Sequence, residues 1–453
     1  MLMPVIFASL PILPEIPTGK WLIEVESRDS PLLLTVDLTE STAQVRRLNW
    51  VINGTVAKTG ESTFIITFPG NILLGAGEMT LTASNSTISG RVTTALFREN
   101  VRGVPVPKVA IPRSSKPAIN GPGFTTLQVP EKLALAKTAG ISIARFQGDQ
   151  VVEEGFYGVD NASTGEPVTA NTRFQAGGMG SVLTCLATLK LAGQGKLDLL
   201  DTVTSFLPGI KIPSKDGKEI RILDLLRGSS GLGQYKFRGY PQTQNPPSLT
   251  ELLNGADPEQ VNPLEIVSPI GEQTAFNGIN HALLQAILEK KTGRDFPSLM
   301  QDLLLRPLRM TRSTFDLRPR AGRNVRFATG HYETGEALLF GNHIYPMLGD
   351  SGLWTTAPDL ARAFIQAGRL LAKKPNHILP PNKMDLLTLV DGPKGVAGLV
   401  RGDPDTYFHG GDTYGQFSNF TLHPQRGTGV VVMTNRVMNW RLVGELIGTA
   451  DQK

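Results

Sequence analysis

The segment that decides the fold is Phe408–Asn435, with the sequence FHGGDTYGQFSNFTLHPQRGTGVVVMTN. With the two residues before it, this segment contains three runs rich in β-branched and aromatic residues, separated by turns that contain Gly or Pro. Such runs predict strands at 406–409, 417–422 and 429–434. A helix is predicted shortly after them, near 440–447. The pattern indicates a group of antiparallel strands at the end of the sequence.

From about residue 124 onward, the chain before this segment mixes strands and helices. Two apolar runs on either side of Gly148-Asp149 predict a hairpin, with strands at 141–146 and 151–157. Apolar residues at helical spacing predict helices at 181–192, 281–291 and 360–371. Two early strands, a helical middle and three late strands predict an α+β domain with one antiparallel sheet over residues 124–453.

The first part of the chain is predicted to be a separate, small all-β domain at 18–98. Short runs typical of strands occur at 21–26, 32–38, 62–68, 78–83 and 89–97. Their close spacing favours a barrel or a sandwich. Residues 99–123 contain five prolines and three glycines and predict a Pro-rich linker. Residues 1–17 predict an N-terminal tail, because the apolar start has no Lys or Arg and is broken by prolines, unlike a secretory signal.

The composition excludes several classes of protein. Apolar residues make up 40% of the 453 residues and charged residues 19%, which is typical of a folded globular chain. The formal net charge is only +5, so no nucleic-acid binding is predicted. No run of about 18 apolar residues occurs, so no membrane span is predicted. The single cysteine, Cys185, excludes an internal disulfide and a Cys-rich metal site, and we expect it to be a buried thiol.

Six segments in the same order resemble the serine β-lactamase and penicillin-binding-protein family. They are 141–174, 191–208, 220–232, 271–293, 352–363 and 408–435. They are most similar to the branch of class C β-lactamases, D-alanyl-D-alanine carboxypeptidases and related esterases. The resemblance covers about residues 135–448 and implies a β-lactamase/transpeptidase-like fold, an antiparallel sheet flanked by helices. It also implies a serine hydrolase without cofactor or metal, in a family that is often extracytoplasmic.

The first catalytic motif of that family is absent. The family has Phe-x-x-x-Ser-x-x-Lys, with the serine at a helix start and the lysine one turn later as its base. Here FQAGGMGSVLT begins at Phe174, so Gly178 stands at the serine position and Ser181 at the lysine position. Glycine has no side chain to acylate, and a serine hydroxyl cannot replace an amine as a base.

The other two motifs are altered to different degrees. The Tyr-x-Asn motif corresponds to Phe276, Asn277 and Gly278, so the ring shape remains and the phenol hydroxyl is lost. The third motif remains as His409, Gly410 and Gly411, which we expect on a strand that forms one wall of the cleft. We also expect a set of side chains after this motif at the mouth of the cleft: Asp412, Tyr414 and Gln416.

Two functions follow from this pattern. The first is a catalytically inactive relative that binds a peptide, a glycan, a small molecule or a protein partner through the inherited cleft or the β-domain. The second is a serine hydrolase with a rebuilt site, in which Ser181, or Ser229 or Ser230, acts with His409. Ser181 and His409 are therefore the candidate catalytic residues. The glycines near Gly178 are either a floor of backbone N–H groups for an anion or the remains of a lost active site.

Overall fold

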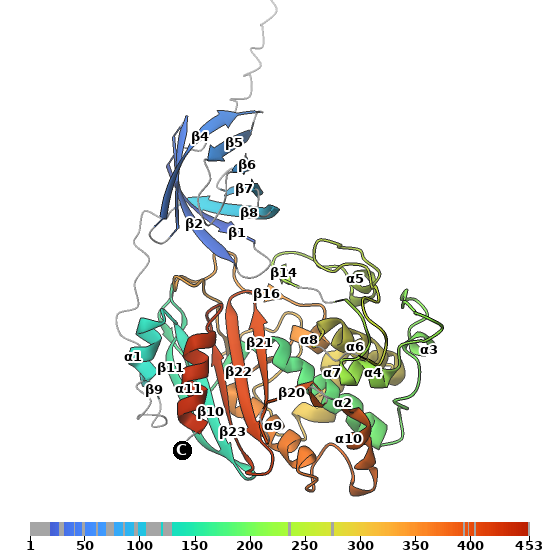
Figure 1. The fold of residues 1–453 in the computed structure, drawn as a ribbon. Helices are drawn as coiled ribbons and strands as arrows, with labels where there is room; N and C mark the ends of the chain where they lie inside the picture. Colours follow the sequence, from blue (N-terminus) through green and yellow to red (C-terminus); the bar gives the residue numbers. More distant parts are fainter. Residues whose placement is uncertain are drawn as a thin grey trace, which may run out of the picture. The chain divides into compact units, whose positions relative to one another are not determined.

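A computed structural model gives the fold of the chain (Figure 1). It describes residues 19–26, 31–39, 41–47, 50–59, 62–68, 77–84, 87–94, 98–105, 119–120, 129–233, 237–272, 276–392, 395–396, 398–402 and 405–451. The chain divides into two compact units, Met1–Ile111 and Pro112–Lys453. The N-terminal tail predicted at 1–17 lies outside the described residues.

The first unit is a closed antiparallel barrel of eight strands in sequence order. Its strands are β1 (Gly19–Val25), β2 (Leu32–Leu38), β3 (Thr42–Arg47), β4 (Trp50–Lys58), β5 (Thr63–Phe68), β6 (Gly77–Ser84), β7 (Thr87–Thr94) and β8 (Arg98–Pro105). The predicted small all-β domain is confirmed, and of its two predicted forms, a barrel or a sandwich, it is a barrel; β3, β4 and β8 are additional to the predicted strands. Alternate residues fill the interior, as in β2, where Leu34, Val36 and Leu38 are buried.

The strand β8 occupies the beginning of the stretch that the sequence predicts to be a linker. Pro105 lies opposite Trp21 where β8 pairs with β1, so the predicted break in strand pairing at residue 99 is wrong. A proline is compatible with this position because it is the last residue of the strand. Residues 106–118 and 121–128 lie outside the described part of the chain, and the linker there remains a prediction.

The second unit is built on a ten-stranded sheet, with the order β12-β11-β10-β23-β22-β21-β20-β19-β18 and β9 paired to β11. Its strands are β9 (Ile119–Asn120), β10 (Gly140–Gln147), β11 (Gln150–Asn161), β12 (Glu166–Pro167), β18 (Asp391–Gly392), β19 (Gly395–Val396), β20 (Leu399–Arg401), β21 (Tyr407–Thr413), β22 (Gln416–His423) and β23 (Thr428–Thr434). The predicted hairpin and the three late strands are therefore confirmed. The hairpin strand β10 pairs with β23, so the two groups meet in the middle of the sheet.

Helices cover both faces of this sheet (Figure 1). The helices are α1 (Val129–Leu135), α2 (Gly180–Gly193), α3 (Val203–Phe206), α4 (Ile222–Arg227), α5 (Leu249–Leu253), α6 (Gly278–Thr292), α7 (Phe296–Met300), α8 (Leu348–Ser351), α9 (Ala357–Leu371), α10 (Asp385–Val390) and α11 (Trp440–Asp451). The short helical turns are η2 (Gly177–Met179), η3 (Gln301–Leu305) and η4 (Pro381–Lys383), and the small sheets add β13 (Thr172–Gln175), β14 (Tyr240–Pro241), β15 (Arg326–Phe327), β16 (His343–Ile344) and β17 (Trp354–Thr355).

Residue alternation along the strands separates two cores. In β23, Val430 and Val432 pack with α1 and α11, whereas Val431 and Met433 face the core that contains α2 and α9. The helix α2 is buried on all sides, which places its first turn inside the domain. This arrangement confirms the predicted α+β domain and sets η2, the turn directly before α2, against the strand β21.

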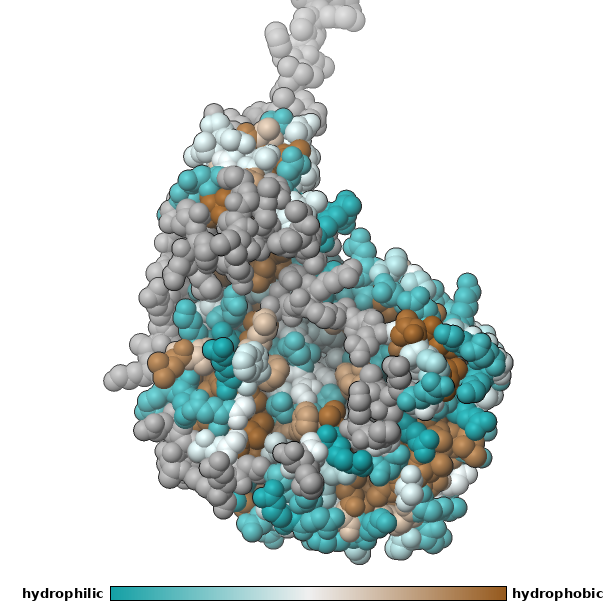
Figure 2. All heavy atoms as spheres, in the orientation of Figure 1, coloured by the Kyte–Doolittle hydropathy of each residue, from teal (hydrophilic) through white to brown (hydrophobic). Residues whose placement is uncertain are grey.

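Among the residues that the structure describes, no helix is both long and apolar enough to cross a bilayer. On the face shown in Figure 2, hydrophobic residues form patches among hydrophilic ones.

Candidate functional site

Gly178, which the sequence motif predicts to stand at the nucleophile position, lies in η2, the turn between β13 and α2. A Cβ atom placed on Gly178 would lie 3.2 Å from His409 Cε1, 3.3 Å from the Gly410 carbonyl oxygen and 3.3 Å from Phe276 Cζ. The structure therefore brings together three segments that are far apart in the sequence. The space for a side chain at the nucleophile position is already lined closely by two rings and a carbonyl group.

Close backbone approach accounts for two of the neighbouring glycines. Gly177 has φ +53°, and a Cβ there would lie 2.6 Å from the Asp412 backbone nitrogen. At Gly411 in β21, a Cβ would lie 1.8 Å from the Ala176 carbonyl oxygen, which is too close for any side chain. The Ser418 hydroxyl donates to the same oxygen at 2.9 Å and holds the turn before η2 against the sheet.

Ser181, at the position of the missing lysine, is fully buried. Its hydroxyl donates to the Gly178 carbonyl oxygen at 2.6 Å. The hydroxyl therefore satisfies a backbone acceptor at the start of α2. The hydroxyl proton is thus directed at a backbone oxygen.

Phe276 forms an aromatic group with two histidines at this position. Its ring packs edge-on against His409, with centroids 4.5 Å apart, and stacks on His281 at 5.2 Å. Phe276 is 41% exposed, so it is a surface wall of the site and not part of the core. Asn277 caps α6 by accepting from the Ile279 N–H at 3.1 Å, and Gly278 begins the helix.

The titratable groups around the site are shifted by burial. Burial lowers the pKa of His409 to about 4 and the pKa of His281 to about 3, and the charge of His409 contributes to the second shift. Both rings are therefore neutral near pH 7. Burial also raises the pKa of Asp350, in α8, to about 6, although a hydrogen bond from Ser351 opposes this shift.

The pair of His281 and Asp350 is absent from the sequence-based site. His281 Nδ1 lies 3.9 Å from Asp350 Oδ1, and neither atom has a hydrogen-bond partner. The pair lies directly behind Phe276, because His281 stacks on that ring. The residues are 69 positions apart, and only the packing of α6 on α8 brings them together, so no local motif could have indicated the pair.

The other predicted residues lie in different environments. Ser229 and Ser230 are buried, and their hydroxyls donate to Asp224 at 3.5 Å and to Asn280 at 2.7 Å. Asp412 is exposed, as expected at the mouth of the cleft. The prediction for Gln416 is wrong: its side chain is fully buried and bonds to the backbone of Gln175 and Ala328.

Two further predictions concern Tyr414 and Cys185. Tyr414 is buried and stacks on His343, so its predicted position at the mouth of the cleft is wrong as well. Cys185 is buried, as predicted, and burial raises the pKa of its thiol to about 12. Among the residues that the structure describes, no three His, Cys, Asp or Glu side chains are grouped as they would be around a metal ion.

Comparison with known proteins agrees with this architecture. Residues 129–444 match the Beta-lactamase family model. The chain is 23% identical over 322 residues to Protein flp of Staphylococcus aureus, an alignment that covers 68% of this chain and 61% of that protein. The chain thus spans about three fifths of the length of the curated relatives it matches.

Solved structures show the same fold at low sequence identity. An octameric penicillin-binding protein homologue from Pyrococcus abyssi has a TM-score of 0.58 at 22% identity, covering 72% of this chain and 77% of that one. EstCE1, a hydrolase with promiscuous acyltransferase activity, has a TM-score of 0.57 at 18% identity, covering 72% of this chain and 96% of that one. With a family match across more than half of its residues, the chain belongs to the Beta-lactamase family.

Proposed function

We propose that this protein is a non-acylating member of the Beta-lactamase family that binds a peptide or peptide-bearing glycan in the inherited cleft. The observation that carries the proposal is the state of the nucleophile position. Gly178 offers no hydroxyl, and His409 and Phe276 occupy the space around it at 3.2 and 3.3 Å from a Cβ placed there. Acyl transfer by the family's route requires a nucleophile in that space.

The hydroxyl groups of the three candidate serines support this proposal. Ser181, Ser229 and Ser230 are all buried, and each hydroxyl already donates to a protein acceptor. A serine nucleophile must instead be accessible and hydrogen-bonded to a base. The alternative, a hydrolase rebuilt around one of these serines and His409, would need a rearrangement that exposes the hydroxyl.

The ligand class follows from the retained wall of the cleft. β21 carries His409, Gly410 and Gly411 at the site, and Phe276 offers a half-exposed aromatic surface beside them. A strand next to an aromatic ring can hold an extended peptide through backbone hydrogen bonds and ring contact. At pH 7 the two histidines are neutral, so recognition rests on shape and hydrogen bonding and not on a cation.

Two measurements test the proposal. Incubation with a fluorescent penicillin, read by intact mass, is expected to give no covalent adduct. Titration calorimetry with the peptide Nα,Nε-diacetyl-Lys-D-Ala-D-Ala and with soluble peptidoglycan fragments is expected to show reversible binding. Phe276→Ala should weaken this binding at least tenfold, since truncation removes the exposed ring.

Phe408→Ala is the matched control. Phe408 is 39% exposed, similar to Phe276, but it is adjacent to His409 in β21 and therefore points to the opposite face of the strand. The Phe408→Ala variant should therefore bind both probes as wild type does. A stoichiometric adduct on any serine would replace the proposal with the rebuilt hydrolase. Equal losses in both Phe variants, or no binding to either probe, would remove the cleft as the binding site.

A further inference from the structure

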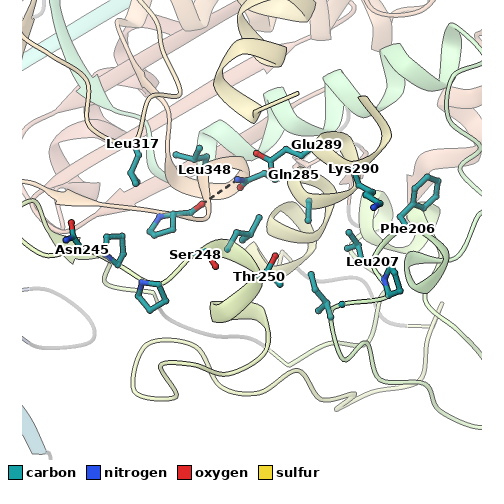
Figure 3. Close-up of a pocket in the computed structure, with 18 of the residues that line it drawn as sticks. Phe206, Leu207, Asn245, Ser248, Thr250, Gln285, Glu289, Lys290, Leu317 and Leu348 are labelled. Atoms are coloured by element: carbon teal, nitrogen blue, oxygen red, sulfur yellow. Dashed lines mark hydrogen bonds between the residues drawn. The ribbon is translucent and has the colours of Figure 1, made fainter. Parts of the chain in front are cut away.

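A cavity of about 720 Å³ lies between α3, α5 and α6, apart from the cleft. In Figure 3, Gln285, Glu289 and Lys290 of α6 lie on one side, Ser248 and Thr250 lie opposite them, and Phe206 and Leu207 close one end. Its size falls within the range of small-molecule sites, roughly 300–1,000 Å³. Neither Gly178, Phe276 nor His409 is among the described residues that line it.

The walls of this cavity are mainly apolar. The apolar lining consists of Phe206, Leu207, Pro208, Ile210, Pro246, Pro247, Leu249, Ala286, Leu317, Pro346 and Leu348. The backbone around them is fixed by Gln285, whose side chain accepts from the Gly349 N–H at 2.9 Å and donates to the Pro346 carbonyl oxygen at 3.5 Å. The cavity is therefore framed by ordered elements and suits a hydrophobic ligand body.

The charged groups at the rim favour an anionic ligand. Lys290 and Arg318 both line the cavity, and the Lys291 ammonium lies 5.8 Å from the centre of the Phe206 ring. The Arg318 guanidinium donates to the carbonyl oxygens of Gln242 and Gln244, so these bonds orient its charge without neutralising it.

The nearby carboxylates offset this charge only in part. Glu289 accepts from the Phe296 N–H at 2.9 Å, and burial raises the pKa of its carboxyl group. Glu251 accepts from the backbone and the hydroxyl of Ser248 in the cap of α5. The lining itself therefore contains two basic side chains, Lys290 and Arg318, and one carboxyl group, Glu289.

We infer that this cavity is a second binding site, for an amphipathic carboxylate with an apolar chain of medium length. The chain lies against the leucines and prolines, the carboxylate meets the Lys290 ammonium at the end that Phe206 closes, and Arg318 adds positive charge elsewhere on the rim. Ion pairing at this exposed rim adds selectivity for the charged group over a neutral one of the same size. The site is independent of the proposed ligand in the cleft.

The test uses the full-length protein and 11-(dansylamino)undecanoate as a fluorescent probe. One saturable site per chain is expected, with displacement by decanoate at least tenfold stronger than displacement by decanol. Ala286→Trp places a large ring in the cavity from α6 and should abolish binding. The double variant Lys290→Gln with Arg318→Gln should weaken probe binding at least tenfold.

Matched variants separate the cavity from general effects. Leu200→Trp adds a ring at an exposed loop position, and Lys373→Gln with Lys383→Gln removes two charges away from the cavity; both should bind the probe as wild type does. Circular dichroism establishes that each variant is folded. Probe binding that survives in folded Ala286→Trp, or that is absent in wild type, would overturn the site. Equal displacement by decanoate and decanol would overturn the anionic class.

Discussion

The rings of His409 and Phe276 pack closely around Gly178. Without a side chain at Gly178, the His409 and Phe276 rings come close enough that a Cβ would lie 3.2 and 3.3 Å from them. At such distances the neighbouring rings would have to move to admit a side chain. Overpacking of this kind lowers the free energy of unfolding by about 1–3 kcal/mol. A side chain at Gly178 therefore requires the neighbouring rings to shift by a few tenths of an ångström.

We predict that Gly178→Ala lowers the free energy of unfolding by about 1 kcal/mol or more. Gly410→Ala is the control, because a Cβ there would have its nearest neighbour at 3.7 Å, and it should lie within about 0.5 kcal/mol of wild type. Adding Phe276→Ala to Gly178→Ala should recover part of the loss, since it removes one of the crowding groups. Urea unfolding of the four proteins measures these differences, and equal effects of the two glycine variants would contradict the packing account.

Asp350 gives a prediction on pH. Burial raises the pKa of its folded state to about 6 from an ordinary value of 3.8. The folded state thus binds the Asp350 proton more tightly than the unfolded state does. The stabilisation of the folded state by this proton is complete below pH 3.8 and is lost as the pH rises through 6. At about 1.4 kcal/mol per pKa unit, the free energy of unfolding falls by about 3 kcal/mol over this pH range.

The variant Asp350→Asn should therefore be more stable than wild type at pH 7.5 and nearly equal to it at pH 3.5. The Ser351 hydroxyl, which donates to Asp350 Oδ2 at 2.9 Å, can donate to the amide oxygen instead. Urea unfolding at the two pH values measures the difference. A variant that is destabilised equally at both values would show that the carboxylate is not under strain from burial.

Among the elements, the helix α6 depends on Asn277 in two ways. The side-chain oxygen accepts from the Ile279 N–H, and the amide nitrogen donates to the carbonyl oxygens of Leu232 at 2.9 Å and Gly233 at 3.0 Å. We predict that Asn277→Ala lowers the free energy of unfolding by about 2 kcal/mol, because the helix loses its cap and two buried carbonyl acceptors are left unpaired. Asn277→Asp keeps the cap but brings a carboxylate against two carbonyl oxygens, so it should be destabilised too.

The exposed cap of α5 serves as the comparison for Asn277. Ser248 accepts from the Glu251 N–H at 3.3 Å and has no buried partners of this kind, so Ser248→Ala should cost about 1 kcal/mol or less. Thermal unfolding of the three variants, measured by circular dichroism, ranks them. If Asn277→Asp were as stable as wild type, the bonds to Leu232 and Gly233 would be of no importance.

The elements also show which parts of the fold the sequence could predict. The hairpin of β10 and β11 and the strands β21–β23 have local signals, because apolar runs end at Gly-containing turns. β3, with the sequence TAQVRR, has only two apolar positions, so its strand character comes from pairing with its neighbours. In the same way, Gly178, Phe276 and His409 were found through motifs, whereas Asp350 acquires its role only when α6 packs on α8.

At the scale of the molecule, the barrel and the Beta-lactamase unit each have a hydrophobic core of their own. We predict that trypsin cuts between Lys108 and Lys116, in the proline-containing stretch, and leaves a stable fragment that begins at Val109 or Ser114 and contains residues 124–453. Mass spectrometry of the digest identifies the fragment, and its unfolding curve should match one transition of the full chain. Resistance in this stretch, with both units unfolding together, would contradict the predicted boundary.

The position of β10 next to β23 has a consequence for synthesis on the ribosome. β10 ends at Gln147 and β23 begins at Thr428, so roughly 280 residues must be made before the central pair of the sheet can form. At about 5–20 residues per second, the nascent chain carries the β10–β11 hairpin without its central neighbour for tens of seconds. The barrel strands, each paired with the next in sequence, can close during that time. During this interval the edge of β10 that β23 later covers is open to pairing with strands of other chains.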